Sequence, residues 1–464
     1  MPTSHRFEPT ILREYDIRGV VGKTLGAEDA YAVGRSFATV VLRNGGRRIV
    51  VGYDGRLSSP MLEAALVEGL ADGGVDVVRI GLGPTPMLYY AEASLADVDG
   101  GIQITGSHNP RDHNGFKFVL GGRPFFGVDI QRLGAVAASG DWESGSGRTE
   151  ERSVLEAYVE RLLHGLAAVP KEPLKALRIG WDAGNGAAGP AVELLTSRLP
   201  GEHHLLFTEV DGHFPNHHAD PTIEANLADL QALVAREGLD FGVAFDGDAD
   251  RIGAIDSTGR VIWGDQLLAI FAEDVLQRMP GAAVIADVKA SRTLFDRVAQ
   301  LGGQPIMWKS GHSLVKAKML ETGAPLGGEM SGHVFFADDY FGFDDGLYAA
   351  VRLMAATVRL GTPLTDLRTA MPETFNTPEL RFPVEESRKF AAIAEVQARL
   401  AQSDADMVAI DGVRVTTPDG WWLLRASNTQ DMLTARAESD SAEGLERLIG
   451  QIDAQLALSG LARS

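Results

Sequence analysis

The chain has 464 residues, ordinary apolar and charged fractions of 45% and 23%, and a formal net charge of −20. So acidic a balance argues against nucleic acid or an anionic membrane as the main partner. The chain contains no cysteine, which excludes disulfides, thiolate metal sites and a cysteine nucleophile. The first ten residues lack the apolar segment of a signal peptide, and no apolar run reaches transmembrane length. We therefore expect a soluble, cytoplasmic protein.

Alternating strand and helix patterns occupy most of the chain. Apolar runs at residues 48–54, 177–182 and 283–287 each end in an aspartate and precede a helical pattern. Three such units predict three related mixed α/β domains. Beyond a proline-rich stretch at 362–383, four strand patterns and one helical pattern predict a smaller C-terminal α+β domain. At about 150 residues per domain, the length allows this division.

The motif T-G-S-H-N-P, residues 105–110, follows a predicted strand at 101–104. Gly106 and Pro110 predict a turn, because glycine permits unusual φ and proline fixes it. Such a turn would lift the Ser107 hydroxyl off the sheet, and we interpret Ser107 as the reacting residue.

Groups near this serine predict an anion site. His108 and Asn109 supply donors within the motif. Residues 114–117 are interpreted as a second turn that brings the ammonium of Lys117 back toward the serine.

The motif D-G-D-A-D-R follows an apolar run at 241–245 and carries three aspartates at alternating positions, Asp246, Asp248 and Asp250. Carboxylates on a curled loop suit a hard cation such as Mg²⁺, with open positions for phosphate. An EF-hand is excluded, because its twelfth position requires glutamate and holds Ser257.

Two later loops have sugar- and phosphate-binding chemistry. In G-E-M-S-G-H, Glu329 and Ser331 are spaced to bond neighbouring hydroxyls of a sugar. A loop of the last domain combines a guanidinium, two hydroxyls and an amide, typical of a phosphate clamp. Its residues are Arg425, Ser427, Asn428 and Thr429.

A glycine-rich stretch at 184–189 matches the dinucleotide fingerprint G-x-G-x-x-G. Asp182 immediately before it would repel a pyrophosphate, so we interpret the stretch as a structural turn that starts a helix. A kinase or phosphatase would share Mg²⁺ and phosphate, but the chain has no G-x-x-x-x-G-K-[ST] motif.

Together these motifs resemble the α-D-phosphohexomutase family, in particular its bacterial phosphomannomutase/phosphoglucomutase branch. The resemblance runs from Tyr15 to Thr429 with the motifs in family order. It implies four domains around a central cleft. The divisions we expect are 1–150 (phosphoserine), 151–256 (metal-binding), 257–368 (sugar-binding) and 369–464 (phosphate-binding lid).

The resemblance also implies site residues. The expected metal ligands are Asp246, Asp248, Asp250 and a phosphoserine oxygen on Ser107. Expected substrate-binding residues are Tyr15, His108, Asn109, Arg251, Lys289, Glu329, Ser331, His333, Arg425, Ser427, Asn428 and Thr429.

The implied reaction interconverts hexose 1-phosphates and 6-phosphates of mannose and glucose through a phosphoserine enzyme and a 1,6-bisphosphate. Mg²⁺ and a catalytic glucose or mannose 1,6-bisphosphate are the expected cofactors. Lys117 is the first candidate for general acid and base, through a pKa lowered by nearby cations. Arg18 and His312 remain candidates.

Other functions stay open on the sequence. A phosphoglucosamine mutase would differ only in its sugar. A non-catalytic sugar-phosphate binder would need no nucleophile. We expect small hexose phosphates as partners, and a monomer or weak dimer.

Overall fold

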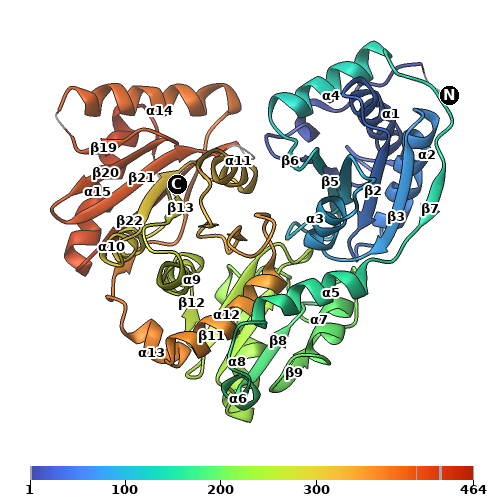
Figure 1. Cartoon of the computed structure of the whole chain (residues 1–464). Helices are drawn as coiled ribbons and strands as arrows, with labels where there is room; N and C mark the ends of the chain where they lie inside the picture. Colours follow the sequence, from blue (N-terminus) through green and yellow to red (C-terminus); the bar gives the residue numbers. More distant parts are fainter. Residues whose placement is uncertain (1–2, 404, 428–430, 463–464) are drawn as a thin grey trace.

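A computed structural model describes residues 3–403, 405–427 and 431–462. It contains four β-sheets that follow one another along the chain, each with its own helices (Figure 1). Three are mixed sheets and the fourth is antiparallel, so the predicted fold class, three related α/β domains and a smaller α+β domain, is confirmed. No helix in the described part of the chain is long and apolar enough to cross a membrane.

In the first sheet a central strand lies parallel to both neighbours, and the chain then returns antiparallel. The strands, in spatial order, are β1 (Ile17–Val20), β5 (His113–Leu120), β4 (Gly100–Ile104), β2 (Arg48–Tyr53), β3 (Asp76–Leu82) and β7 (Thr149–Glu151), with β6 (Arg123–Pro124) beside β5. The helices are η1 (Pro9–Ile11), α1 (Ala27–Arg43), α2 (Ser59–Asp72), α3 (Thr85–Ser94) and α4 (Val128–Ser139).

The second sheet repeats this arrangement. Its strands are β12 (Val261–Ile262), β11 (Ile252–Asp256), β10 (Phe241–Phe245), β8 (Arg178–Asp182) and β9 (Glu202–Leu206). The helices that precede and flank it are α5 (Leu155–Leu163), η2 (His164–Leu166), α6 (Lys171–Ala176), α7 (Gly189–Thr196), η3 (Glu224–Leu227) and α8 (Ala228–Glu237).

The third sheet has the same core of parallel strands with one antiparallel return. Its strands are β14 (Gln304–Trp308), β13 (Ala283–Asp287), β15 (Leu326–Gly328) and β16 (Val334–Phe336). Its helices are α9 (Gly264–Arg278), α10 (Arg292–Gln300), α11 (His312–Thr322), α12 (Gly346–Leu360) and α13 (Leu364–Thr369).

The three mixed sheets place their motifs at one equivalent position, the hairpin loop between the last parallel strand and its antiparallel partner. The serine loop joins β4 to β5, the aspartate loop joins β10 to β11, and the Glu329 loop joins β15 to β16. In each sheet the central strand ends at a buried aspartate that accepts a main-chain N–H. Gly106 donates to Asp54 (3.0 Å), Gly184 to Asp182 (2.8 Å) and Met330 to Asp287 (3.2 Å).

The fourth sheet is antiparallel throughout. The sequence predicted four strands and one helix; the structure adds a further helix whose buried face includes Ala392 and Val396, and two short edge strands. The strands are β17 (Phe375–Asn376), β22 (Met432–Ser439), β21 (Gly420–Ala426), β20 (Val413–Thr417) and β19 (Met407–Val408), with β18 (Leu380–Pro383) beside β22; the helices are α14 (Glu386–Ala401) and α15 (Ala442–Leu458).

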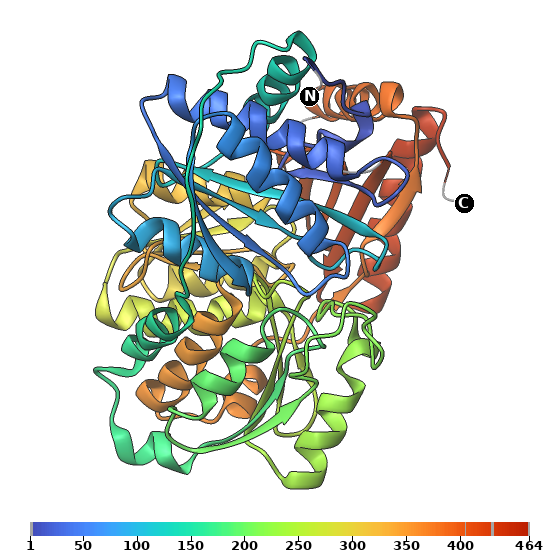
Figure 2. The same ribbon diagram turned by 90° about the vertical axis from the view of Figure 1, so that its right-hand side faces the viewer.

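The apolar cores divide the molecule unequally. One continuous core joins the second and third domains, where α12 packs against α5 and η2 (Figure 1, Figure 2). The same core reaches the first domain, where α3 packs against α5. The C-terminal domain has a core of its own between Phe382 and Leu456. Its apolar contact with the third domain is small and centres on Val288, Trp421 and Leu423.

Candidate active site

Ser107 lies on the hairpin loop after β4 and is 2% exposed. Its hydroxyl oxygen is 3.0 Å from Nδ1 of His108 and donates to Oδ2 of Asp246 at 3.0 Å. The unusual φ expected at Gly106 belongs to Ser107 itself, at 49°. Left-handed backbone at a non-glycine residue is strained and occurs disproportionately at functional sites.

Glycine is required in this loop for space. A Cβ on Gly106 would lie 2.4 Å from Nε of Arg56, and one on Gly247 would lie 2.5 Å from the carbonyl oxygen of Ser107. The serine loop and the aspartate loop therefore pack main chain against main chain, which brings Ser107 to the carboxylates.

Arg56, which the sequence analysis did not single out, holds the serine loop. Its side chain is 1% exposed and pairs with Asp54 at 3.3 Å. A single guanidinium offers five donors in a rigid fork, enough to fix an irregular loop. Its terminal nitrogens donate to four carbonyls, those of Ser107 (2.8 Å), Asn109 (2.6 Å), Pro110 (2.7 Å) and His113 (3.0 Å).

Asp246, Asp248 and Asp250 are fully buried, with ligand atoms within 4.8 Å of one another. Oδ1 of Asp248 and Oδ1 of Asp250 have no hydrogen-bond partner among the described residues. Burial, followed by repulsion from the other two carboxylates, raises the pKa of Asp246 well above its ordinary value. Converging buried oxygens without donors are what a hard divalent cation requires, so the residues present fit Mg²⁺.

Lys117 offsets part of the negative charge of this acidic group. Its Nζ donates to Oδ2 of Asp248 at 2.7 Å and to Oδ2 of Asp250. Burial alone would lower the pKa of Lys117, but the attraction of the two carboxylates outweighs it and raises the pKa well above its ordinary value. The lowered pKa that we expected for Lys117 is thus wrong for this state of the protein. The predicted turn at 114–117 is also wrong: these residues lie inside β5, whose register with β4 brings Lys117 opposite Gln103.

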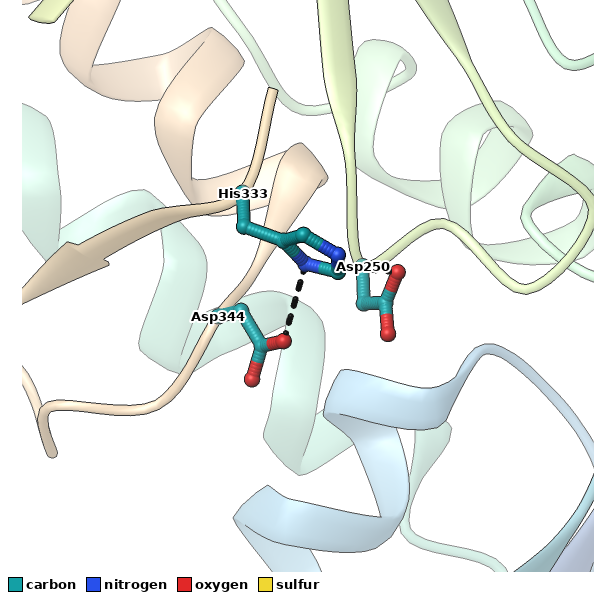
Figure 3. A group of neighbouring side chains, drawn as sticks. All are labelled: Asp250, His333 and Asp344. Carbon is teal, nitrogen blue, oxygen red and sulfur yellow. Dashed lines mark ion pairs between the residues drawn. The ribbon is translucent and has the colours of Figure 1, made fainter. Parts of the chain in front are cut away.

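A second group shares Asp250 with the aspartate loop (Figure 3). Nδ1 of His333 lies 3.0 Å from Oδ2 of Asp344 and 3.6 Å from Oδ1 of Asp250. Lys316 donates to Oδ1 of Asp344 at 2.8 Å. Because this ammonium already balances Asp344, we interpret the group as a charged network that orients His333. Asp344 was not identified from the sequence, since it belongs to no recognisable motif.

Cations gather around Ser107 in spite of the negative net charge. Arg251 donates through Nε to Nε2 of His333 at 3.0 Å. Burial, then the positive charges of Arg251, Arg18 and Lys117, lower the pKa of His108 well below its ordinary value. Arg18 also pairs with Asp16. This local field favours an anion such as phosphate beside the serine.

A second set of predicted residues meets at Ser310, a residue not identified from the sequence. Its carbonyl accepts from the Tyr15 hydroxyl at 2.8 Å, and its N–H donates to Oδ2 of Asp411 at 3.0 Å. The same oxygen of Asp411 accepts from Nε of Arg425 at 3.1 Å. The first, third and fourth domains are therefore joined at one point.

Glu329 is the acidic member of this second set. Its Oε1 accepts from the Gly311 N–H at 2.7 Å and from the Ser310 hydroxyl at 3.3 Å. Burial raises its pKa. Lys289 lies nearby, with Nζ 3.8 Å from Oδ2 of Asp287.

His312 connects the two sets. Its ring stacks on His333 with centroids 5.3 Å apart and meets the edge of Tyr15 at 5.8 Å. Ser331 is half-buried in the Glu329 loop, and Ser427 is 7% exposed at the end of β21. Asn428 and Thr429 lie outside the described residues.

The glycine-rich stretch after β8 forms a turn, as expected. Oδ1 of Asp182 accepts from the Gly184 N–H at 2.8 Å, and Oδ2 lies 3.0 Å from Nε2 of His217. The carboxylate thus sits at the main-chain N–H that a pyrophosphate would use in a dinucleotide site.

Comparisons with known proteins cover nearly the whole chain. Models of the phosphoglucomutase/phosphomannomutase family match residues 9–142 (α/β/α domain I), 156–259 (domain II), 263–375 (domain III) and 379–455 (C-terminal domain). The chain is 45% identical over 439 residues to the phosphomannomutase/phosphoglucomutase of Pseudomonas aeruginosa, covering 95% of this chain and 94% of that protein. It is 42% identical over 442 residues to the phosphoglucomutase of Neisseria gonorrhoeae, covering 94% and 95%. A solved phosphoglucomutase/phosphomannomutase family protein from Burkholderia thailandensis has a TM-score of 0.92 at 43% identity, covering 99% of both chains.

Proposed function

This chain belongs to the phosphoglucomutase/phosphomannomutase family, and from that premise we propose that Ser107 carries the phosphoryl group it transfers. As a member of that family it is an enzyme, a phosphohexomutase. The observation that carries the proposal is the Ser107 hydroxyl, 3.0 Å from Asp246 and beside the positive charges that act on His108. Phosphoryl transfer depends mainly on positioning and charge neutralisation, and these groups supply both.

The proposed reaction consists of two transfers. The bond between phosphorus and the Ser107 oxygen breaks as a new bond forms to the free hydroxyl of a hexose 1-phosphate, giving a 1,6-bisphosphate. The bisphosphate reorients, and its 1-phosphoryl group returns to Ser107 and leaves a hexose 6-phosphate. Each transfer removes a proton from the attacking hydroxyl and returns one to the leaving oxygen. Lys117, Arg18 and His312 are the candidate groups for these steps.

Asp246, Asp248, Asp250 and a phosphoserine oxygen on Ser107 are the proposed ligands of Mg²⁺. Bound there, the ion supplies charge neutralisation for the transferring group. Lys117 shares oxygens of Asp248 and Asp250 in the structure, so metal binding and this ion pair compete for the same carboxylates. We propose that Lys117 is released toward the phosphate when the metal is bound.

We propose that the substrates are mannose and glucose phosphates, activated by a trace of the 1,6-bisphosphate. Glu329 and Ser331 would hold the 3- and 4-hydroxyls. The distal phosphate would be held by Arg425, Ser427, Asn428 and Thr429, and the remaining contacts would come from Tyr15, His108, Asn109, Arg251, Lys289 and His333. The names of the relatives, which include both sugars, support this choice over a phosphoglucosamine mutase. We retain as proposals the domain divisions stated above, a cytoplasmic location, and a monomer or weak dimer.

Ser107→Ala tests the proposal. With glucose 1-phosphate, Mg²⁺ and trace glucose 1,6-bisphosphate, the variant should lose turnover while its melting temperature stays unchanged. Intact-mass analysis of the wild type should detect one phosphoryl group, located at Ser107 by peptide mapping. Undiminished turnover in Ser107→Ala would overturn the proposal, and an unphosphorylated wild type that binds without turnover would indicate a sugar-phosphate binder.

A further inference from the structure

The loop that carries Lys289 is held by the C-terminal domain. It follows β13 in the third domain and runs from residue 288 to 292. Nη1 of Arg414, on β20, donates to the carbonyls of Val288 at 2.6 Å and Ala290 at 2.7 Å. Nη1 of Arg436, on β22, donates to the carbonyl of Lys289 at 2.5 Å. Three successive carbonyls are thus bound by two arginines of another domain.

The end of the same loop is bound by a carboxylate of β22. Oε1 of Glu438 accepts from the Ser291 hydroxyl at 2.9 Å and from the Arg292 N–H at 3.1 Å. It also accepts from Nε1 of Trp421 at 2.8 Å, which fixes its orientation. Every residue from 288 to 292 therefore has a direct bond from its main chain or side chain to the C-terminal domain.

Burying the charges of Arg414, Arg436 and Glu438 costs free energy, which argues that this contact does more than hold the two domains together. Arg414 is 5% exposed and lies over the face of Trp421, 3.5 Å from the ring centroid. Burial lowers the pKa of its guanidinium to about 9. An apolar pair of similar volume would hold two domains together at no such cost. Two arginines aimed at consecutive carbonyls instead specify one position of the loop.

The side chain of Lys289 is left to its own domain. Its Nζ lies 3.8 Å from Oδ2 of Asp287, while only its carbonyl is bound by Arg436. The C-terminal domain thus fixes the main-chain position of Lys289, and Asp287 of the third domain attracts its ammonium group.

We propose that Arg414 and Arg436 are positioning residues that place Lys289 for the substrate, so that docking of the C-terminal domain and placement of Lys289 are one event. The inference rests on the proposed function, in which Lys289 contacts the hexose phosphate. Neither arginine needs to touch substrate, because both act on the main chain of the 288–290 segment.

A double-mutant cycle tests this relationship. Arg414→Met should lower kcat/KM for glucose 1-phosphate by about 10-fold to 100-fold, the cost of misplacing a binding group. In a Lys289→Ala background the same substitution should cause little further loss, since the group that it positions is absent. Losses that multiply in the double variant would overturn the proposal. Arg436→Lys is the alternative variant if Arg414→Met does not fold, because it keeps the charge but shortens the reach to the Lys289 carbonyl. It should also lower kcat/KM when Lys289 is present and cause little further loss in the Lys289→Ala background.

A second measurement does not depend on activity. Amide hydrogen exchange at residues 290–292 should be faster in Arg414→Met than in the wild type, and Arg414→Lys should restore much of the protection. Arg399→Met is the matched control, because among the described residues Arg399 donates to Gln455 and Ser459 of its own C-terminal domain. It should change neither exchange at 290–292 nor kcat/KM. Unchanged exchange in Arg414→Met would refute the positioning role, whereas absent mutase activity in the wild type would refute only the proposed function.

Discussion

The hydroxyl oxygen of Ser107 lies 3.0 Å from Oδ2 of Asp246, although 139 residues separate them in the chain. The contact joins equivalent hairpin loops of the first and second domains. Thr85 strengthens the junction, because its hydroxyl donates to Oδ2 of Asp248 at 2.5 Å and its N–H to the Asp248 carbonyl at 2.9 Å. Nucleophile and metal loop are therefore positioned by the docking of two domains.

Asp248→Asn should weaken Mg²⁺ binding at least about tenfold, since even outer-shell changes at metal sites have effects of that size. The substitution removes one of three buried negative charges while keeping the side-chain shape. Calorimetric titration with Mg²⁺ alone measures the affinity.

Asp344→Asn is the matched control, because Asp344 belongs to the neighbouring group that also contains Asp250. It should leave Mg²⁺ affinity unchanged; His333→Gln replaces it if loss of the Lys316 ion pair unfolds the protein. If Asp344→Asn weakened Mg²⁺ binding and Asp248→Asn did not, the metal would belong to the group of Asp250, His333 and Asp344.

Arg56→Met should destabilise the protein by about 3–5 kcal/mol, because it leaves Asp54 as an unpaired buried charge and four carbonyls without a donor. The surviving folded fraction should also lose kcat, since the loop of Ser107 is no longer fixed. Thermal melting and steady-state kinetics measure both effects. Arg43→Met, which removes an exposed pair with Asp141, should leave the melting temperature nearly unchanged. Equal costs for the two variants would contradict the role given to Arg56.

Asp345 should make stability depend on pH. Burial raises its pKa to about 6, although its carboxylate accepts from the hydroxyls of Tyr158 (3.0 Å) and Tyr340 (2.8 Å). The unfolded pKa is about 3.9. Between about pH 4 and pH 6 the native state therefore holds a proton that the unfolded state has lost, and stability falls as pH rises. The contribution is on the order of 3 kcal/mol.

Asp345→Asn removes this titration while keeping the side-chain shape and one oxygen that accepts hydrogen bonds. The melting temperature of the wild type should therefore fall relative to that of Asp345→Asn as the pH is raised from 4 to 7. Melting curves recorded across that range decide the question; a constant difference between the two proteins would show that Asp345 does not titrate there.

Glu329→Ala should lower catalysis with mannose 1-phosphate and glucose 1-phosphate by similar factors. The proposed contacts of Glu329 are the 3- and 4-hydroxyls, which the two sugars share, and not the 2-position, where they differ. Arg425→Ala should mainly raise KM for both, because it removes a group that binds phosphate. Parallel kinetics with the two substrates measure this. A large loss confined to mannose 1-phosphate in Glu329→Ala would show that this loop does distinguish the 2-position.

Asp411→Ala should loosen the C-terminal domain. Asp411 joins Arg425 to Ser310, and this domain has an apolar core of its own. Small-angle scattering should show a larger radius of gyration for the substrate-free variant than for wild type, and compaction of wild type with glucose 1-phosphate. Asp419→Ala, which loses an exposed pair with Arg447 in the same domain, is the control and should scatter like wild type. Identical profiles with and without substrate would count against lid motion.

Local sequence determined the elements and the motif chemistry, because both depend on neighbours in the chain. The apolar run before Asp54 predicted β2, and the alternation of Asp246, Asp248 and Asp250 predicted a cluster of carboxylates. Where local signals conflicted with pairing, the prediction failed. Residues 114–117 contain a turn-like Asn-Gly pair, yet β4 and β1 bond them on both sides into β5.

Only the tertiary structure decided how charges far apart in the chain are paired. Arg56 holds the Ser107 loop, Asp411 joins Arg425 to Ser310, and Arg414 binds the carbonyls flanking Lys289. In the sequence these are isolated charged residues without a motif, since their partners are main-chain carbonyls or residues of other domains. The direction of the Lys117 pKa also depended on the fold, because the pKa follows the carboxylates that packing brings within 3 Å and not the residues beside it in the chain.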